Sequence, residues 1–259
     1  MTSTTSTTPT TGQAGAIRTY LGLELNRLLR DRRSMLLTFL LPPLFFLIFR
    51  SSAAYQDITA GTGTNALAYV MVSMALYGAL TVVTSGAAGV AAERAQGWTR
   101  QLRVTPLSPW SYVLVKVLAS MTLGAVAVVL TFVVGRYGGA EMPLATWIAC
   151  GLIAVCGSFV FAAFGLFMGY LLPAGNLVQV LSPIVLLLSF AGGLIVPVSA
   201  DSWFAGIAPL VPTYGVAELV RAPLAGGGVP QVAVVNAVAW AAIFVAGAVW
   251  RFRRDTARM

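Results

Sequence analysis

The chain has 259 residues, of which 58% are hydrophobic and only 9% are charged, whereas about a quarter of the residues in a soluble globular domain are charged. A water-soluble protein of this size could not bury so much apolar side chain, so the composition predicts a multispan membrane protein. The net charge of +8 would suggest a nucleic-acid partner in a soluble domain, but basic residues beside membrane spans explain it more simply. With no histidine and two cysteines, the chain cannot assemble the usual zinc ligand sets or a Ser-His-Asp site, and we expect no metal site and no catalytic residues.

The N-terminal part divides into a polar tail and an amphipathic segment. Residues 1–12 are rich in serine and threonine and show no hydrophobic period, so we expect a disordered tail. A cleavable signal peptide needs a basic start followed by an apolar stretch, so we expect no cleavage here. Between residues 16 and 33, apolar residues recur three or four positions apart with arginines on the other side, which predicts an interfacial amphipathic helix.

Residues 13–259 are predicted to form a single transmembrane domain with six apolar blocks. The blocks are residues 34–49, 66–92, 113–135, 144–172, 177–198 and 232–250. All except the first are long enough, as helices, to cross a hydrocarbon core about 30 Å thick. The first block is short and contains Pro42-Pro43, so we expect a kinked span that continues from the interfacial helix. Because the blocks are continuously apolar and do not alternate, we predict an all-α membrane protein with six transmembrane helices.

The basic residues are distributed unevenly between the two sides of these spans. Twelve of the sixteen lie before the first block, between the second and third blocks, or after the last block, and Lys116, near the start of the third block, flanks the same connection. Only Arg50, Arg136 and Arg221 fall on the other side. The positive-inside rule therefore predicts that both termini are cytoplasmic. Since topology accounts for the net charge, we expect no nucleic-acid partner.

The blocks themselves contain almost no ionisable residue. Lys116 is the one Asp, Glu, Lys or Arg among them. Proton- and ion-coupled carriers usually place ionisable groups at membrane depth, so the energy for any uphill transport is expected to enter from elsewhere. Three polar residues of the fifth block, Gln179, Ser182 and Ser189, could line a polar path, and interhelical hydrogen bonding explains them equally well.

Two pairs of small residues have the spacing that lets helices approach closely. They are Ser85 and Gly89 in the second block, and Gly165 and Gly169 in the fourth. Such spacings are frequent by chance in glycine-rich apolar sequence. Packing within the bundle is therefore favoured over a dimer seam for each pair.

The segment between the second and third blocks is the most informative. It reads ERAQGWTRQLRVTPLSPW over residues 93–110, and it begins with Glu93 and Arg94 at the expected water boundary. The two X-Pro pairs in its second half are expected to stop a helix. The segment is thus predicted to present a short charged helix to the cytoplasm, and its composition is also that of an ordinary positive-inside loop.

This segment resembles the cytoplasmic loop of permeases of the type-2 ABC exporter family, the membrane subunits of bacterial drug- and antibiotic-resistance-type ABC transporters. The resemblance rests on the order Glu-Arg, Gly-Trp, two spaced arginines and the run VTPLSP. In such permeases the loop after span two contacts a separate ATP-binding subunit. Carried over to this chain, the resemblance places the ATPase contact at Glu93, Arg94, Gly97, Trp98, Arg100 and Arg103.

The resemblance extends to the whole chain, including the outer segment before the last span. That segment is similar to the family's pattern for short re-entrant helices between spans five and six, at Trp203, Phe204, Pro209, Pro212 and Tyr214. Trp203 and Phe204 would form an apolar plug that closes the path, and anchoring of Trp203 at the headgroups is an equal alternative.

The length of the outer segment also predicts local structure. Residues 199–230 are too many for a structureless connection in a compact bundle. We predict one short helix over residues 201–207 and a second over residues 214–222. In the second helix, Glu218 and Arg221 are one turn apart and can pair.

The ion-free spans and the resemblance together predict the permease subunit of an ATP-driven exporter in the bacterial plasma (inner) membrane. The chain has no Gly-x-x-x-x-Gly-Lys-Ser/Thr motif, so ATP and Mg are expected on two copies of a partner ATPase and no cofactor on this chain. A second permease subunit, identical or a close paralogue, would complete the route. A hydrophobic small molecule, such as a drug or antibiotic, is the favoured cargo because the spans carry few charges. The alternatives are export of a lipid- or glycan-linked substrate, and a membrane scaffold or enzyme without transport.

Overall fold

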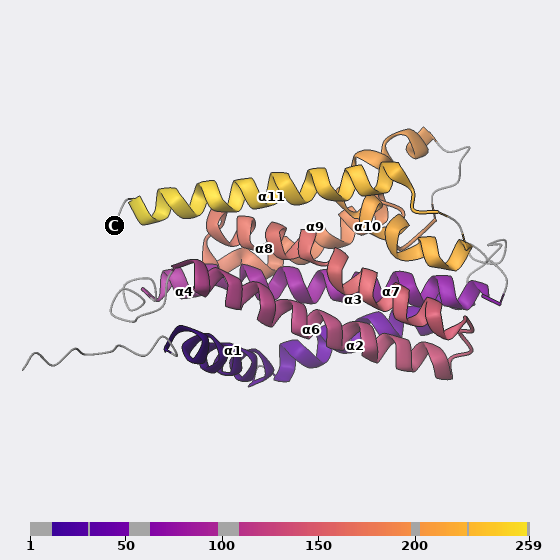
Figure 1. The fold of residues 1–259 in the computed structure, drawn as a ribbon, viewed down its shortest axis with the longest axis horizontal. Coiled ribbons are helices and arrows are strands. Elements are labelled where there is room, and N and C mark those ends of the chain that lie inside the picture. The colour runs from indigo at the N-terminus through magenta and orange to yellow at the C-terminus, as the bar shows by residue number, and fades with distance from the viewer. Residues whose placement is uncertain are drawn as a thin grey trace, which may run out of the picture.

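The computed structural model describes residues 12–30, 32–51, 63–97, 109–197, 203–226 and 228–257. Within these ranges all regular elements are helices, and the long helices run side by side in one bundle (Figure 1). The α-helices are α1 (Gly12–Arg30), α2 (Arg32–Phe49), α3 (Ala66–Ala88), α4 (Val90–Ala95), α6 (Pro109–Tyr137), α7 (Leu144–Gly157), α8 (Phe159–Leu171), α9 (Leu177–Ala191), α10 (Pro212–Arg221) and α11 (Gln231–Ala257). Short 3-10 helices are η2 (Ala174–Asn176), η3 (Trp203–Gly206), η4 (Ala208–Leu210) and η5 (Ala222–Ala225). The all-helical prediction is confirmed for the part of the chain that the structure describes.

Four helical stretches among the described residues are long and apolar enough to cross a membrane. They are Ala66–Ala95, Trp110–Tyr137, Leu144–Leu171 and Gln231–Arg254, which correspond to the second, third, fourth and sixth apolar blocks. The first and fifth blocks contain the shorter apolar helices Phe39–Phe49 and Gln179–Ala191. Six spans therefore remain a prediction, with these two helices as the additional candidates.

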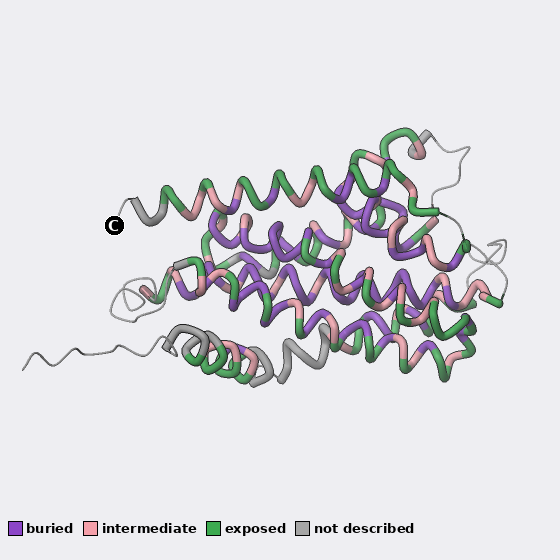
Figure 2. The backbone as a smooth tube through the Cα atoms, in the orientation of Figure 1, coloured by how far each residue is buried: buried purple, intermediate pink, exposed green. Residues whose placement is uncertain are grey.

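The helix α3 forms the centre of the bundle. Every residue from Val70 to Leu80 is buried (Figure 2), and α3 packs against α2, α6, α7, α8, α9 and α10. A helix that is apolar on all sides must be covered, either by other helices or by lipid, and other helices cover α3. By contrast, α11 exposes large apolar side chains such as Val235 and Val238, which is the surface expected to face lipid.

Small residues allow this close enclosure of α3. A Cβ atom at Gly165 of α8 would overlap the carbonyl oxygen of Thr84, and one at Gly169 would lie 2.7 Å from Cγ1 of Val90. On the other side of α3, a Cβ atom at Gly86 would lie 2.9 Å from Cβ of Ser120. The prediction that Gly165 and Gly169 serve packing within the bundle is confirmed.

Two of the predicted spans contain a local irregularity, at Gly89 in the second and at Ser158 in the fourth. Both residues keep right-handed helical φ and ψ angles, and helices lie directly on both sides of each. The Ser158 hydroxyl donates a hydrogen bond to the carbonyl oxygen of Val155 at 2.7 Å. Since these irregularities occur inside apolar sequence, the hydrophobic pattern gives no sign of them. The Pro42-Pro43 pair lies inside α2, which continues to Phe49.

The close approach of α8 to α3 yields a stability prediction. Gly165→Ala should lower the free energy of unfolding by about 1–3 kcal/mol, because the added methyl group meets backbone atoms that cannot move aside. The measurement is the thermal unfolding midpoint of the purified protein in lipid nanodiscs. Gly22→Ala is the control, since nothing lies within 4 Å of a Cβ atom there and alanine favours the helix. Equal midpoints for the two variants would contradict the assigned packing.

Candidate functional site

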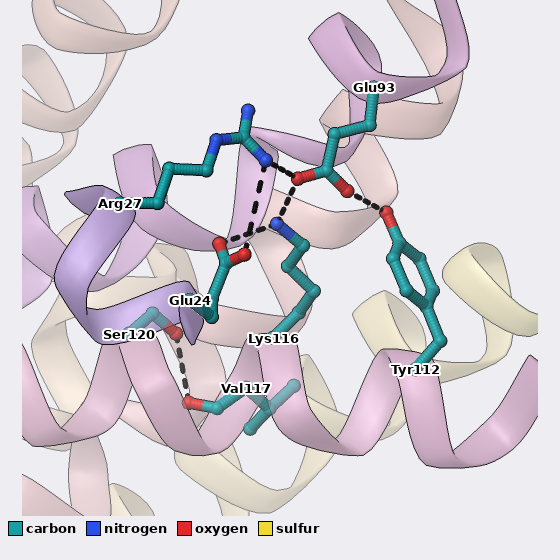
Figure 3. Close-up of polar contacts among 7 residues, drawn as sticks. All are labelled: Glu24, Arg27, Glu93, Tyr112, Lys116, Val117 and Ser120. Carbon is teal, nitrogen blue, oxygen red and sulfur yellow. Dashed lines mark hydrogen bonds and ion pairs between the residues drawn. The ribbon is translucent and has the colours of Figure 1, made fainter. Parts of the chain in front are cut away.

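Three helices meet at one end of the bundle and bring buried charges together. We call it the basic end: it is where α1, α4, the start of α6 and the end of α11 lie, on the left in Figure 1. There α1 contributes Glu24, α4 contributes Glu93 and α6 contributes Lys116 (Figure 3). Each of these three side chains is at most 3% exposed.

The charged groups of the basic end form one connected network. The Lys116 ammonium group donates a hydrogen bond to Oε1 of Glu24 at 2.5 Å and another to Oε1 of Glu93. Arg27 donates to the same oxygen of Glu93 and lies 3.9 Å from Oε2 of Glu24. The Tyr112 hydroxyl donates to the second oxygen of Glu93. We call Glu24, Arg27, Glu93 and Lys116 the ionic cluster; its two carboxylates and two cations balance.

Such a cluster can exist in an apolar bundle only because it is complete. An unpaired buried charge costs several kcal/mol, and pairing with good hydrogen bonds offsets that cost. Burial on its own lowers the pKa of Arg27, but the carboxylates of Glu93 and Glu24 outweigh it and raise this pKa above its ordinary value. The cluster therefore fixes α1 against α4 and α6. Among the described residues, no group of three His, Cys, Asp or Glu side chains could hold a metal ion.

A second contact holds α4 from the other side. Arg94 donates hydrogen bonds to the carbonyl oxygens of Gly169, at 3.3 Å, and Tyr170, at 3.2 Å, in the last turn of α8. Its guanidinium also lies 5.4 Å from the centroid of the Tyr170 ring. A cation at the C-terminal end of a helix satisfies carbonyl groups that have no partner within the helix. Thus Glu93 ties α4 to α1 and α6, and Arg94 ties it to α8.

The structure describes half of the residues that the resemblance assigns to the ATPase contact. Glu93 and Arg94 are expected at the water boundary, but the side chains of both form hydrogen bonds with other helices of this chain. Glu93 is only 2% exposed. Gly97 follows α4 with a φ of 74°, which glycine adopts without steric cost. The other three lie outside the described residues: Trp98, Arg100 and Arg103.

The pattern of α1 contained a signal for the ionic cluster that our sequence analysis did not use. Glu24 falls on the apolar stripe of α1, three residues after Leu21 and four before Leu28. A carboxylate on an apolar face requires a buried cation, and Lys116 is the one cation inside an apolar block. We had assigned Lys116 to the flanking charges of a loop, whereas its side chain is only 2% exposed.

At the opposite end, the outer segment folds into the bundle. The predicted helix over residues 201–207 is represented by η3 and η4, and the second predicted helix by α10, which begins at Pro212. Proline suits this first position because the N–H that it lacks would have no partner in the helix. Trp203 and Phe204 belong to η3, but their side chains are outside what the structure describes.

Arg221 anchors α10 inside the bundle. Its guanidinium donates hydrogen bonds to Oγ of Ser73 at 2.8 Å and to the carbonyl oxygens of Gly193, at 3.0 Å, and Leu194, at 2.7 Å. It also lies 4.3 Å from the centroid of the Tyr69 ring. We had counted Arg221 among the loop charges of the outer side, but it is only 7% exposed. The predicted pair with Glu218 is confirmed at 3.7 Å, although that carboxylate is 38% exposed.

The last helix satisfies the irregular backbone of the outer segment. The Asn236 amide donates to the carbonyl oxygens of Pro209, at 2.6 Å, and Val211, at 3.1 Å, and its own oxygen accepts the N–H of Gly215. The Trp240 indole N–H donates to the carbonyl oxygen of Leu210 at 3.0 Å. Non-helical backbone at membrane depth is tolerated only where the protein provides such partners. The remaining predicted residue of this segment, Tyr214, is half-buried on α10.

The three polar residues of α9 differ in their surroundings. Gln179 and Ser182 are exposed, whereas Ser189 is fully buried. The Ser189 hydroxyl donates to the carbonyl oxygen of Val185 at 2.7 Å, within the same helix. The structure therefore does not bring the three residues onto one common surface.

Removal of the central cation tests the ionic cluster. Lys116→Met should destabilise the protein by about 3–5 kcal/mol, because it leaves Glu24 facing Glu93 in a buried site. The double variant Lys116→Met with Glu24→Gln should regain part of this loss, since Glu93 keeps Arg27 and Tyr112. Thermal unfolding midpoints measure both effects, and Arg136→Met on the exposed surface is the control. A single variant as stable as the control would show that the cluster has no structural role.

Loss of the Arg221 guanidinium should loosen the outer segment. Arg221→Met leaves the carbonyl groups of Gly193 and Leu194 and the Ser73 hydroxyl without this donor, at about 1–3 kcal/mol for an unsatisfied buried group. Faster hydrogen–deuterium exchange in α10 is the expected result. Glu218→Gln should change the exchange little, because a half-exposed ion pair contributes at most about 1 kcal/mol. Similar exchange in both variants would contradict the anchoring role.

Comparison with known proteins agrees with this architecture. Residues 47–250 match the model of a family described as "ABC-2 family transporter protein". A protein of Bacillus subtilis (strain 168) named "Putative transport permease YvfS" is 23% identical over 206 residues, which cover 76% of this chain and 82% of that protein. The match to the family includes Glu93, Lys116 and Arg221, and α1 lies outside it. Since the family model covers most of the chain, the chain belongs to the ABC-2 family of transporter membrane proteins.

Proposed function

We propose that the chain is the permease subunit of an ATP-driven exporter whose energy comes from a separate ABC ATP-binding subunit. Membership of the ABC-2 family indicates a transport permease with membrane-spanning helices. The relative in Bacillus subtilis is likewise named as a transport permease. The chain itself has no P-loop motif, which is the usual means of holding nucleotide phosphates. Hydrolysis of ATP, with Mg, is therefore assigned to the partner.

The observation that carries the proposal is the fixing of α4 on two sides. The loop proposed to contact the ATPase follows α4 directly. Glu93 joins α4 to α1 and α6, and Arg94 joins it to α8. A displacement of this loop by the partner would therefore move α1, α4, α6 and α8 together, which is what transmission of a nucleotide-driven motion requires.

The composition of the spans supports a hydrophobic cargo. In the described spanning stretches, charged side chains lie only near the two ends, such as Glu93 and Lys116 at one end and Arg136 at the other. A drug- or antibiotic-like molecule can pass such a surface without an unpaired charge in the path. The exposed Gln179 and Ser182 of α9 would line the route between this chain and a second permease subunit, which is a second copy or a close paralogue.

The remaining features of the proposal concern assembly and orientation. Two permease subunits and two ATPase subunits form the complex in the bacterial inner membrane. The basic end faces the cytoplasm, because most of the basic residues cluster there. The helices α2 and α9 complete six spans, and the segment from η3 to η5 forms the re-entrant helices on the outer side.

Charge reversal in the loop tests the ATPase contact. Arg100→Glu together with Arg103→Glu should reduce the co-purified ATPase on the order of tenfold, because interfacial charges set partner choice and orientation. The ATPase is taken from the neighbouring reading frame and co-expressed with the permease. ATP-dependent efflux of a hydrophobic dye should fall in parallel, while membrane insertion stays normal.

A matched reversal at the opposite end provides the control. Arg50→Glu with Arg136→Glu changes two exposed arginines and should leave the complex intact. A full amount of ATPase bound to the loop variant would contradict the proposed contact. If the unaltered permease binds no ATPase at all, the alternative of a scaffold without transport is favoured.

A further inference from the structure

An apolar groove opens on the outside of the bundle, away from α9 and from the proposed transport route. It lies between α6, α8 and α11 and has a volume of about 230 Å³. Aliphatic side chains line much of it, including Leu114, Leu166 and Val245. Leu114 and Val245 are 50% and 37% exposed, so the groove is open to the surrounding lipid.

Aromatic side chains surround the groove where it reaches the basic end. Trp110, Tyr170 and Phe252 come from the start of α6, the end of α8 and the end of α11. The Phe252 ring centroid lies 5.5 Å from that of Trp110 and 5.8 Å from that of Tyr170. Tryptophan and tyrosine are enriched at the level of lipid headgroups. This end of the groove is therefore expected to lie at the membrane–water boundary.

Directly beside this aromatic end, α11 carries three arginines. Arg251, Arg253 and Arg254 lie within one turn that includes Phe252, and Arg253 and Arg254 are exposed. The Arg254 guanidinium lies 4.6 Å from the centroid of the Trp250 ring, and that of Arg251 lies 5.7 Å from it. These two guanidinium groups thus lie near Trp250, which does not line the groove, whereas Arg253 directly follows Phe252 of the groove lining.

We propose that the groove binds an acyl chain of an anionic phospholipid whose phosphate lies at the basic end of α11, beside the exposed Arg253. The site is apolar along its length, aromatic at its mouth and basic just beyond, and these are the features of a phospholipid in the same order. Basic segments beside a membrane helix attract anionic lipids. A second protein chain would not explain why the charges lie at only one end. The site does not depend on the proposed export function; it depends on the basic end lying at a membrane surface.

The test uses the full-length protein in nanodiscs of equal parts phosphatidylcholine and phosphatidylglycerol. After extraction in mild detergent, native mass spectrometry measures the retained lipid. The unaltered protein should retain phospholipid and prefer phosphatidylglycerol. Val245→Trp with Val249→Trp fills the groove and should reduce the retained lipid severalfold. Val234→Trp with Val238→Trp is the control, because it makes the same change at the same spacing on α11 outside the groove.

Headgroup recognition is tested separately. Arg253→Gln with Arg254→Gln should keep a bound lipid but reduce the preference for phosphatidylglycerol on the order of tenfold. Arg50→Gln with Arg136→Gln, at the opposite end, should leave the preference unchanged. All variants should elute as the unaltered protein does on size exclusion.

Three results would overturn the proposal. The first is equal lipid retention in the groove-filling variant and its control. The second is no preference for phosphatidylglycerol in the unaltered protein. The third is a change of oligomeric state when the groove is filled, since this would identify the groove as a seam between two copies.

Discussion

The contact between α8 and α3 has no space for a side chain, and the polar contacts of the basic end are built around that close approach. Helices in a membrane gain little from hydrophobic burial against each other, so their association depends on van der Waals packing over matched surfaces. At Gly165 and Gly169 the two backbones themselves come together. This places the last turn of α8 beside α4, where the carbonyl groups of Gly169 and Tyr170 accept hydrogen bonds from Arg94. A larger residue in either glycine position would separate the groups that hold α4.

The polar contacts described above are concentrated at the two ends of the continuous stretch formed by α3 and α4. Ser73, which accepts a hydrogen bond from Arg221, lies on α3, and Glu93 lies on α4 directly after it. Twenty helical residues rise about 30 Å, which is the thickness of a hydrocarbon core. A separation of this size would place the two sets of charges at opposite boundaries of such a core, and both sets are buried and paired within the chain. Between them, α3 is buried and carries no Asp, Glu, Lys or Arg, so it separates the two charged ends.

Patterns within single segments were sufficient for much of the architecture. The apolar blocks, the small-residue pair on α8 and the pair of Glu218 with Arg221 depend on residues close together in the chain, and periodicity detects them. The ionic cluster depends on contacts across 92 residues, between Glu24 and Lys116. No local spacing encodes such a pair. The sequence does contain both partners, Glu24 and Lys116, each as a charged residue among apolar ones. This shared feature indicates that the two residues pair.

The outer segment also depends on contacts between distant residues, so local patterns predict its helices but not their position. The prolines indicated where helices stop, but not that α10 turns back into the bundle. Its position depends on hydrogen bonds between distant residues. Arg221 of α10 donates to the turn after α9, and Asn236 and Trp240 of α11 donate to the backbone of η4 and its neighbours. Asn236 stands as a lone amide in an apolar block. In a membrane helix such a residue indicates a polar partner close by, and here the partners are the backbone carbonyl groups of Pro209 and Val211.

The ionic cluster also limits how the molecule can move. Separation of α1 from α4 or α6 would leave a buried charge without its partner, at a cost of about 3–5 kcal/mol. These three helices are therefore expected to move as one body, and Arg94 adds the end of α8 to it. The helix α9 is held differently, because it packs on α3 and α10 through mainly apolar side chains, with the hydrogen bond from Thr213 to the carbonyl oxygen of Leu188 near its end. Apolar contacts can slide by small steps at little cost, as in shear motions of packed helices. Under the proposed function, movement that opens a route is thus expected beside α9, while the basic end transmits it without deforming.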